Sequence, residues 1–66
     1  MSPGDLVRIK NTIGTRMLYT EIVGKVGVII SRGEVEDPRA EAAIVGEVLV
    51  EEKVVLLAWG YLEPAR

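Results

Sequence analysis

Cysteine and histidine are both absent from this 66-residue chain, and aromatic residues make up only 5% of it. Without cysteine no disulfide can form, and without either residue the usual ligands of a zinc site are missing. No apolar run approaches the roughly 18 residues that span a bilayer. The N-terminus has no basic stretch followed by an apolar region, so we expect no secretory signal peptide and no membrane insertion.

Positive charge is also in short supply. The chain has 8 Lys and Arg against 10 Asp and Glu, which gives a formal net charge of −2 and a pI of about 5.0. Nucleic-acid binders normally gather basic side chains because phosphate contacts dominate their affinity. The balance therefore counts against nucleic acid as the main partner.

What the chain does have is aliphatic residues. The apolar fraction is 48% and the mean hydropathy is +0.26, both high for a chain this short. A chain of this size forms one domain, here residues 1–66, and buries only about 60% of the surface exposed on unfolding. With no disulfide or metal available, we expect stability to come from apolar packing or from association.

Two short glycine-containing segments predict the first two strands. In residues 3–10, PGDLVRIK, a turn is followed by Val7 and Ile9 alternating with Arg8 and Lys10. In residues 24–31, GKVGVIIS, glycines precede a β-branched run and permit a sharp bend or the close approach of another backbone. Together they predict a small, strongly curved β-barrel.

The rest of the chain completes a five-stranded, all-β fold. A long loop is expected over residues 11–23, with its apolar centre folded across one end of the barrel. Residues 32–43 are polar at first and contain Gly33 and Asp37-Pro38, which predict an exposed acidic loop between strands two and three. Strands are expected at residues 44–50, with Gly46 as a candidate bulge, at 54–58, and at 62–63 after a 3₁₀ turn at 59–61.

One strand breaks the alternation expected of a sheet with one wet face. Residues 54–59, VVLLAW, are apolar at every position, and VLV at 48–50 repeats the pattern. Whichever set faces the core, the other set forms an outward apolar patch that favours contact with another protein chain. The candidate interface residues are Val48, Val50, Val55, Leu57, Trp59, Tyr61 and Tyr19. For Trp59 and Tyr61, an alternative is that they close the end of the barrel.

These segments resemble the SH3-like small-barrel pattern. GDLVRI at 4–9, GKVGVI at 24–29, VLV at 48–50 and YLEP at 61–64 follow its order of Gly-Asp-x-Val-x-Ile, Gly-x-x-Gly-x-Ile, a Val-rich hairpin and a closing Leu-Glu. The first half is similar to the KOW motif of ribosomal and transcription proteins. The whole layout resembles short SH3-like proteins encoded by tailed bacteriophages of cyanobacteria, and also small SH3-like accessory subunits of photosynthetic complexes.

The resemblance implies a binding module whose partners are protein subunits. A small phage-encoded protein that decorates or cements a larger assembly and self-associates is the first expectation, located in the host cytoplasm or the virion. A KOW-like nucleic-acid or ribonucleoprotein module is an alternative, and an accessory subunit of a photosynthetic electron-transfer complex is another. The basic side chains available to the KOW-like alternative are Arg8, Lys10, Arg16 and Lys25.

No catalytic constellation can be assembled from these residues. Without His or Cys there is no nucleophile–base pair, and no phosphate-binding loop occurs. Carboxylate pairs such as Glu34/Glu36 and Glu51/Glu52 fall in predicted exposed turns, which favours solvated turn charges over acid–base catalysis. We therefore expect a protein that is not an enzyme, with no metal, cofactor or small-molecule substrate.

Overall fold

The computed structural model describes residues 1–37 and 40–65. The elements are β1 (Leu6–Ile9), α1 (Ile13–Leu18), β2 (Val26–Asp37), β3 (Ala40–Val50), β4 (Lys53–Ala58), the 3₁₀ turn η1 (Trp59–Tyr61) and β5 (Leu62–Pro64). The five strands form one antiparallel sheet in the order β4-β3-β2-β1-β5. The prediction of an all-β, five-stranded fold is confirmed. Within the described residues no pairing joins β4 to β5, so the sheet is curved but not closed.

The first strand forms as its sequence predicts. The Asp5 amide donates to the Ser2 carbonyl at 3.0 Å, and Gly4 adopts φ = 93°, a conformation that side chains disfavour. The chain then extends, with Val7 and Ile9 buried and Leu6 and Arg8 exposed. The turn therefore sets the register of β1, and the period-two pattern sets its inner face.

The core lies on the inner face of the sheet and is aliphatic. All five strands contribute to it, so one curved sheet covers its own apolar face. Burying side chains of this size stabilises the fold by roughly 1.5–3 kcal/mol each. The buried members are Val7, Ile9, Ile29, Val48, Val50, Leu57 and Leu62.

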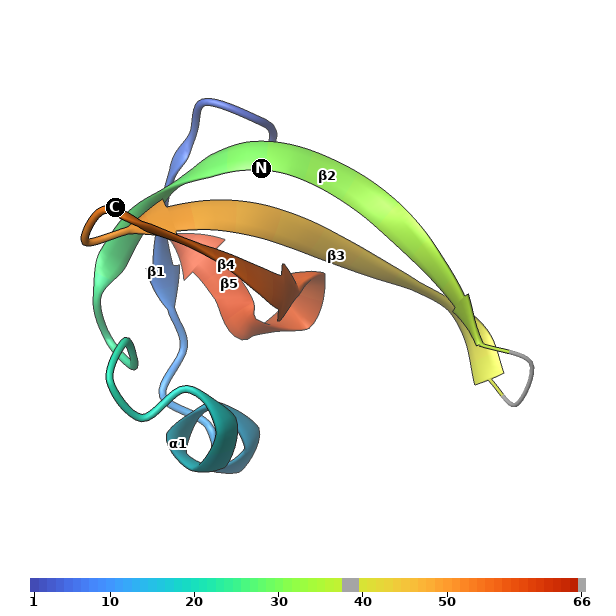
Figure 1. Cartoon of the computed structure of the whole chain (residues 1–66), viewed down its shortest axis with the longest axis horizontal. Helices are drawn as coiled ribbons and strands as arrows, with labels where there is room; N and C mark the ends of the chain where they lie inside the picture. Colours follow the sequence, from blue (N-terminus) through green and yellow to red (C-terminus); the bar gives the residue numbers. More distant parts are fainter. Residues whose placement is uncertain (38–39, 66) are drawn as a thin grey trace.

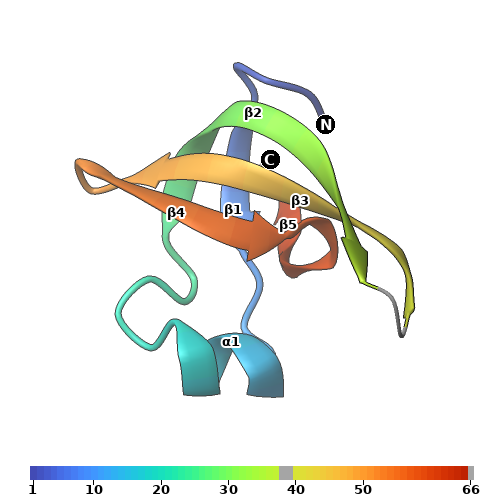
Figure 2. The same ribbon diagram turned by 45° about the vertical axis from the view of Figure 1, so that its right-hand side comes forward.

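The β2–β3 hairpin is longer than predicted. Residues 32–37 belong to β2 and residues 40–43 to β3, so the predicted acidic loop over 32–43 is wrong for the part of it that the structure describes. Figures 1 and 2 show the two strands continuing past β4 as a two-stranded arm. Residues 32–35, which alternate between the two faces of the arm, are all exposed, so the polar residues among them and Gly33 do not interrupt the strand.

The segment between β1 and β2 contains a helix rather than only a loop. Thr12 caps α1: its hydroxyl accepts from the Thr15 amide at 3.1 Å, and the Thr15 hydroxyl accepts from the Thr12 amide at 2.8 Å. Thr15 is fully buried, and its hydroxyl donates to the Lys10 carbonyl at 2.6 Å. One threonine therefore fixes the helix to the end of β1.

Two glycines have roles that differ from each other. A Cβ on Gly27 would lie 2.7 Å from the Leu49 carbonyl oxygen, so β2 and β3 approach closely there, as predicted for this segment. Gly46, the candidate bulge, is instead paired regularly with Arg32 and Leu57. The β2–β3 pairing has two register shifts, one between Val35 and Asp37 and one at Ile30, which is the extra residue between the pairs Ile29↔Val48 and Ser31↔Glu47.

Candidate protein-contact surface

Three of the predicted interface residues lie inside the protein. Val48, Val50 and Leu57 are buried members of the core, and so they present no surface to a partner. Their placement is a correction to the sequence-based assignment. Because β4 pairs with β3 in the register Leu57↔Gly46 and Val55↔Val48, the odd-numbered side chains of β4 turn inward. The exposed apolar set on β4 is therefore Val54, Leu56 and Ala58.

The other four predicted interface residues are half-buried and pack against the core. They are Val55, Trp59, Tyr61 and Tyr19.

Trp59 covers the strand beside it. A Cβ on Gly46 would lie 3.0 Å from the Trp59 ring, and the Arg32 guanidinium lies 5.4 Å from the ring centroid. Trp59 is thus held between β3 and the base of the arm, as expected of a residue that closes an end of the core.

Tyr19 reaches the free edge of the sheet. Its hydroxyl donates to the Leu56 carbonyl at 3.2 Å. Unpaired backbone groups on an edge strand are a template for adding another strand. The Tyr19 hydroxyl is therefore the hydrogen-bond partner of one such backbone group, the Leu56 carbonyl, near the middle of β4.

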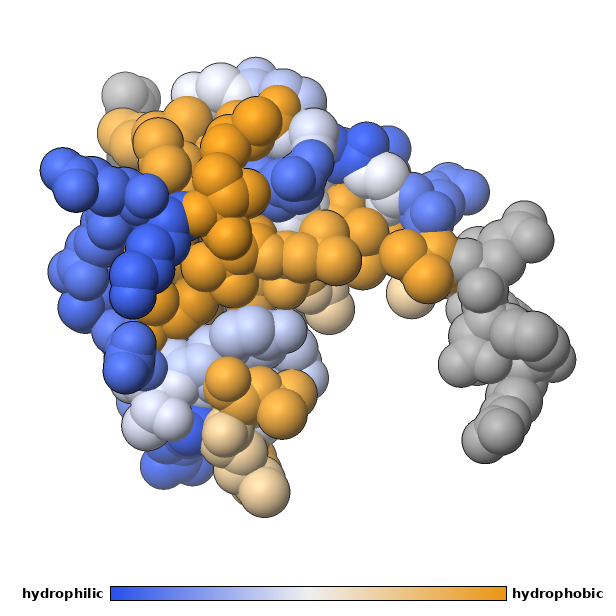
Figure 3. Space-filling model, viewed as in Figure 1, coloured by the Kyte–Doolittle hydropathy of each residue, from blue (hydrophilic) through white to orange (hydrophobic). Residues whose placement is uncertain are grey.

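An apolar row crosses the outer face of the sheet. We use "outer-face row" for Leu6, Val28, Leu49 and Val54, which are cross-strand neighbours on β1, β2, β3 and β4. Leu6, Leu49 and Val54 are 53%, 41% and 57% exposed. Figure 3 shows apolar surface over the strands of the sheet. Three more exposed apolar side chains lie on this outer face, each two residues along its strand from a member of the row. They are Val26, Ile30 and Leu56.

A second apolar surface lies on α1. Ile13, Met17 and Leu18 are 70%, 77% and 69% exposed, and Figure 3 shows apolar atoms at that end of the molecule. The predicted folding of this segment's apolar centre across the barrel is therefore wrong for Met17 and Leu18, while Tyr19 does pack on the core. A groove of about 320 Å³ runs beside Leu18, Tyr19 and Val55.

The four basic residues have different surroundings. Lys25 forms an ion pair of 2.7 Å with Glu51, and Arg8 lies opposite Glu63 in the β1–β5 pair. Arg16 is on α1, where its Nε donates to the Thr12 carbonyl at 3.4 Å. Lys10 is half-buried just after β1. Carboxylates therefore accompany two of the four, which weakens the local positive potential.

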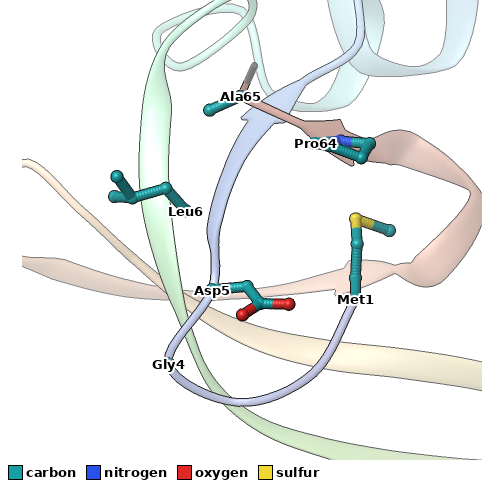
Figure 4. Close-up of a pocket in the computed structure, with 6 residues that line it drawn as sticks. All are labelled: Met1, Gly4, Asp5, Leu6, Pro64 and Ala65. Carbon is teal, nitrogen blue, oxygen red and sulfur yellow. The ribbon is translucent and has the colours of Figure 1, made fainter.

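The hollow drawn in Figure 4 lies between the N-terminal turn and the end of β5. Its volume of about 450 Å³ is within the range of ligand pockets, but ligand pockets also have convergent polar groups. Here the one carboxylate, on Asp5, accepts from the Ser2 amide at 2.9 Å. We therefore assign the Asp5 carboxylate a role in holding the N-terminal turn.

Among the side chains that the structure describes, those of residues 1–35 and 43–65, no group of three or more Asp or Glu is placed to hold a metal ion. In the described backbone, residues 1–37 and 40–65, no helix has the length and apolar character needed to cross a membrane.

The sequence contained a signal for the outer-face row. The unbroken apolar run on β4 predicts an outward row, but its inner and outer sets are equally apolar. Leu6 and Val28 each precede a buried residue in the sequence. Because successive side chains of a strand point to opposite faces, both point outward once Val7 and Ile29 are assigned to the core. The register between the strands, which places the four side chains side by side, comes from the structure.

Comparisons with protein-family models, curated proteins and solved structures found no match to this chain.

Proposed function

We propose that this chain is a non-enzymatic protein-contact module, an accessory or structural subunit with an SH3-like barrel fold. The fold assignment is supported by the strand order, in which β5 lies beside β1, and by the 3₁₀ turn that connects β4 to β5. The functional assignment is carried by the outer-face row. Four aliphatic side chains on four adjacent strands form a continuous apolar strip, and such strips in small proteins mark contact surfaces.

The biological setting is proposed from the resemblance of the sequence to short SH3-like phage proteins. In that setting the chain decorates or cements a larger assembly in the host cytoplasm or the virion. The two other settings give different outcomes in the same experiment. A nucleic-acid module is captured only with intact nucleic acid and low salt, and a photosynthetic accessory subunit co-purifies with a membrane complex.

The test is capture from a lysate of the native source, with and without nuclease and at low and high salt. Tagged wild-type protein is compared with Leu49→Lys, which places a charge in the outer-face row, and with Met17→Lys, a matched change on α1. We expect one stoichiometric protein, either an untagged copy of this chain or another subunit, to survive nuclease and salt. Leu49→Lys should abolish its capture and Met17→Lys should not.

The two lysine variants must be compared as folded proteins, which circular dichroism establishes before capture. Equal capture by the wild type and Leu49→Lys would remove the outer-face row from the proposal. Capture that disappears with nuclease would replace the protein partner with nucleic acid, and Arg8 would become the first residue to change.

A further inference from the structure

The β2 edge of the arm has no strand beside it. β1 pairs with β2 as far as Val28. The N-terminal turn then occupies Ile29, whose amide donates to the Asp5 carbonyl at 3.1 Å and whose carbonyl accepts from the Gly4 amide at 2.8 Å. Past Ile29, no other strand of the described residues pairs with this edge, and Figures 1 and 2 show none beside it. An unpaired edge is a template for adding a strand.

The pairing between β2, β3 and β4 determines which backbone groups face this edge. The Leu56 carbonyl points away from β3, since it accepts from the Tyr19 hydroxyl. Leu56 faces Glu47, so these two residues do not exchange backbone hydrogen bonds, and the amide and carbonyl of Glu47 point to β2 instead. Their partner in β2 is Ser31. The amide and carbonyl of Ser31 therefore point to β3.

From Ser31 onward the direction of the backbone groups alternates along the arm. Successive residues of an antiparallel strand send their amide and carbonyl to opposite sides. The groups of Gly33 therefore point to β3, and those of Arg32 and Glu34 point to the free edge. An added strand would form its backbone hydrogen bonds with these two residues.

Two register shifts bound this stretch of β2, one between Ile29 and Ser31 and the other between Val35 and Asp37. The stretch between them is regular, and Gly33 is its centre. Bulges bend the strand that carries them, so β2 leaves the line of the stretch at both ends. A partner strand can therefore follow the stretch without running on to Ile29, where the N-terminal turn is bound.

Charges of opposite sign flank Gly33. Arg32 and Glu34 are exposed and lie on the same face of the strand. Among the side chains that the structure describes, the one ion pair joins Lys25 to Glu51, so Arg32 and Glu34 have no ionic partner there.

These charges select one register for two antiparallel copies of the arm. Registers that keep the free backbone groups facing each other place Arg32 opposite Arg32, Glu34 opposite Glu34, or Arg32 opposite Glu34. Like charges directly opposite each other are destabilising, and opposite charges are favourable. The register that is centred on Gly33 is therefore preferred. In that register, charges of the kind that usually guard an edge strand become attractive.

We propose that a second copy of this chain pairs with the arm, β2 against β2, about a two-fold axis that passes through Gly33 at right angles to the sheet. Arg32 then faces Glu34 of the second copy, and the symmetry makes this pair twice, each with two backbone hydrogen bonds. The two arms become one four-stranded sheet, which is more stable than a two-stranded ribbon in water. The contact includes no member of the outer-face row, so the proposal goes beyond the proposed function and does not rest on it.

A single introduced cysteine tests the axis, because the chain has none of its own. Gly33→Cys places two thiols opposite each other, with about 4.5 Å between the Cα atoms, a separation that a disulfide spans. Gly60→Cys is the matched control, since both glycines are exposed, have open space at the Cβ position and lack a positive φ. The purified variants are oxidised by air with a copper–phenanthroline catalyst, and covalent dimer is measured by non-reducing electrophoresis. We expect Gly33→Cys to cross-link about tenfold faster than Gly60→Cys or more.

The register is tested with Ser31→Cys and Val35→Cys, since position 31 of one copy faces position 35 of the other. Within either variant alone, the two thiols are four residues apart along the paired strands, roughly 13 Å, which a disulfide cannot span. Each variant alone should stay monomeric. An equimolar mixture should form the mixed covalent dimer, which mass spectrometry identifies.

The charges are tested in the Gly33→Cys protein. Adding Arg32→Glu leaves two negative side chains beside the axis, and adding Glu34→Arg leaves two positive ones. Each change should slow cross-linking by roughly tenfold, since two attractions become two repulsions. Mixing the two proteins restores both attractions and should restore the rate. The mixture is the decisive step because Arg32 also stacks on the Trp59 ring, and an arm disturbed by loss of that contact would not recover on mixing.

Equal cross-linking of Gly33→Cys and Gly60→Cys overturns the proposal. It is also overturned by a cross-link at position 33 that ignores the charge changes, or by a mixture of Ser31→Cys and Val35→Cys that stays monomeric. These failures are distinct from failure of the proposed function. Leu49→Lys should leave the cross-linking of Gly33→Cys unchanged, and Arg32→Glu should leave capture through the outer-face row unchanged.

Discussion

The hydroxyl of Tyr61 lies directly against the backbone of Gly14, so close that a methyl group on Gly14 would be 2.5 Å from the oxygen. The contact joins α1 to the 3₁₀ turn that leads into β5, two elements far apart in the sequence. Glycine at this position therefore leaves room for the Tyr61 hydroxyl, although glycine weakens a helix.

Replacing Gly14 with alanine separates these two effects. In a helix the change normally stabilises by roughly 0.5–1 kcal/mol. Here the added methyl meets Tyr61, and overpacking of this kind costs about 1–3 kcal/mol. We expect Gly14→Ala to lower the free energy of unfolding, measured by urea denaturation.

The matched variant is Tyr61→Phe, which removes the oxygen that the methyl would meet. Gly14→Ala/Tyr61→Phe should be more stable than Gly14→Ala alone. If Gly14→Ala is as stable as the wild type, α1 does not sit against Tyr61.

The strands of the core could be predicted because their signals are local. The turn before β1, the alternation of Val7 and Ile9 with polar residues, and the 3₁₀ turn at Trp59 each depend on neighbours within a few positions. The arm could not be predicted, since its strands lie beyond β4 and residues 32–35 are exposed on both of its faces. No apolar alternation is then needed, and Gly33 with its polar neighbours reads as a loop.

The helix α1 was missed for a related reason. Its cap is formed by Thr12 and Thr15, whereas the usual sequence signature of a capping box has glutamate or glutamine at the second position. The sequence predicted an outward apolar surface on β3 and β4, but three of the residues assigned to it are buried. The run on β4 showed that an apolar row must face outward, but the choice between Leu57 and Leu56 depended on the pairing with β3.

The close approach of β2 to β3 predicts a difference between two glycines. A Cβ on Gly27 would lie 2.7 Å from the Leu49 carbonyl oxygen, which is backbone and cannot move aside by changing rotamer. A Cβ on Gly33 would meet nothing within 4 Å. We expect Gly27→Ala to destabilise the fold by about 1–3 kcal/mol and Gly33→Ala, in an open strand position, to be neutral or to stabilise it by up to about 1 kcal/mol.

Thermal unfolding of the two alanine variants side by side measures this difference. The same added methyl group is compared in both, so general effects of alanine on the unfolded chain cancel. Equal melting temperatures would show that β2 and β3 are further apart at Gly27 than the structure has them.

The buried hydroxyl of Thr15 predicts the effect of an isosteric change. Thr15→Val keeps the shape but leaves the Lys10 carbonyl and the Thr12 amide without their partner. Unsatisfied groups of this kind cost about 1–3 kcal/mol, and we expect urea denaturation to show a loss of that size. Thr20→Val, at an exposed position, is the control and should be close to neutral. A neutral Thr15→Val would mean that water replaces the hydroxyl.

The turn between β3 and β4 is held in a conformation that its residues disfavour. Glu51 and Glu52 have φ values of 49° and 69°, the left-handed region that two-residue hairpin turns require and that glycine or asparagine adopts most readily. Glu51 is also engaged with Lys25, so Glu52 is the residue to change. Glu52→Gly removes the steric penalty of the side chain, and we expect a gain of roughly 0.5–1 kcal/mol in the free energy of unfolding.

The measurement is urea denaturation at two protein concentrations, because a stability that changes with concentration would include self-association. Glu63→Gly, in β5 with an ordinary negative φ, is the matched control and should lose roughly 0.5–1 kcal/mol. The same substitution is then expected to change stability in opposite directions at the two glutamates. If both variants are destabilised equally, the turn does not hold Glu52 in the left-handed region, and the register Val50↔Lys53 that depends on this turn must be revised.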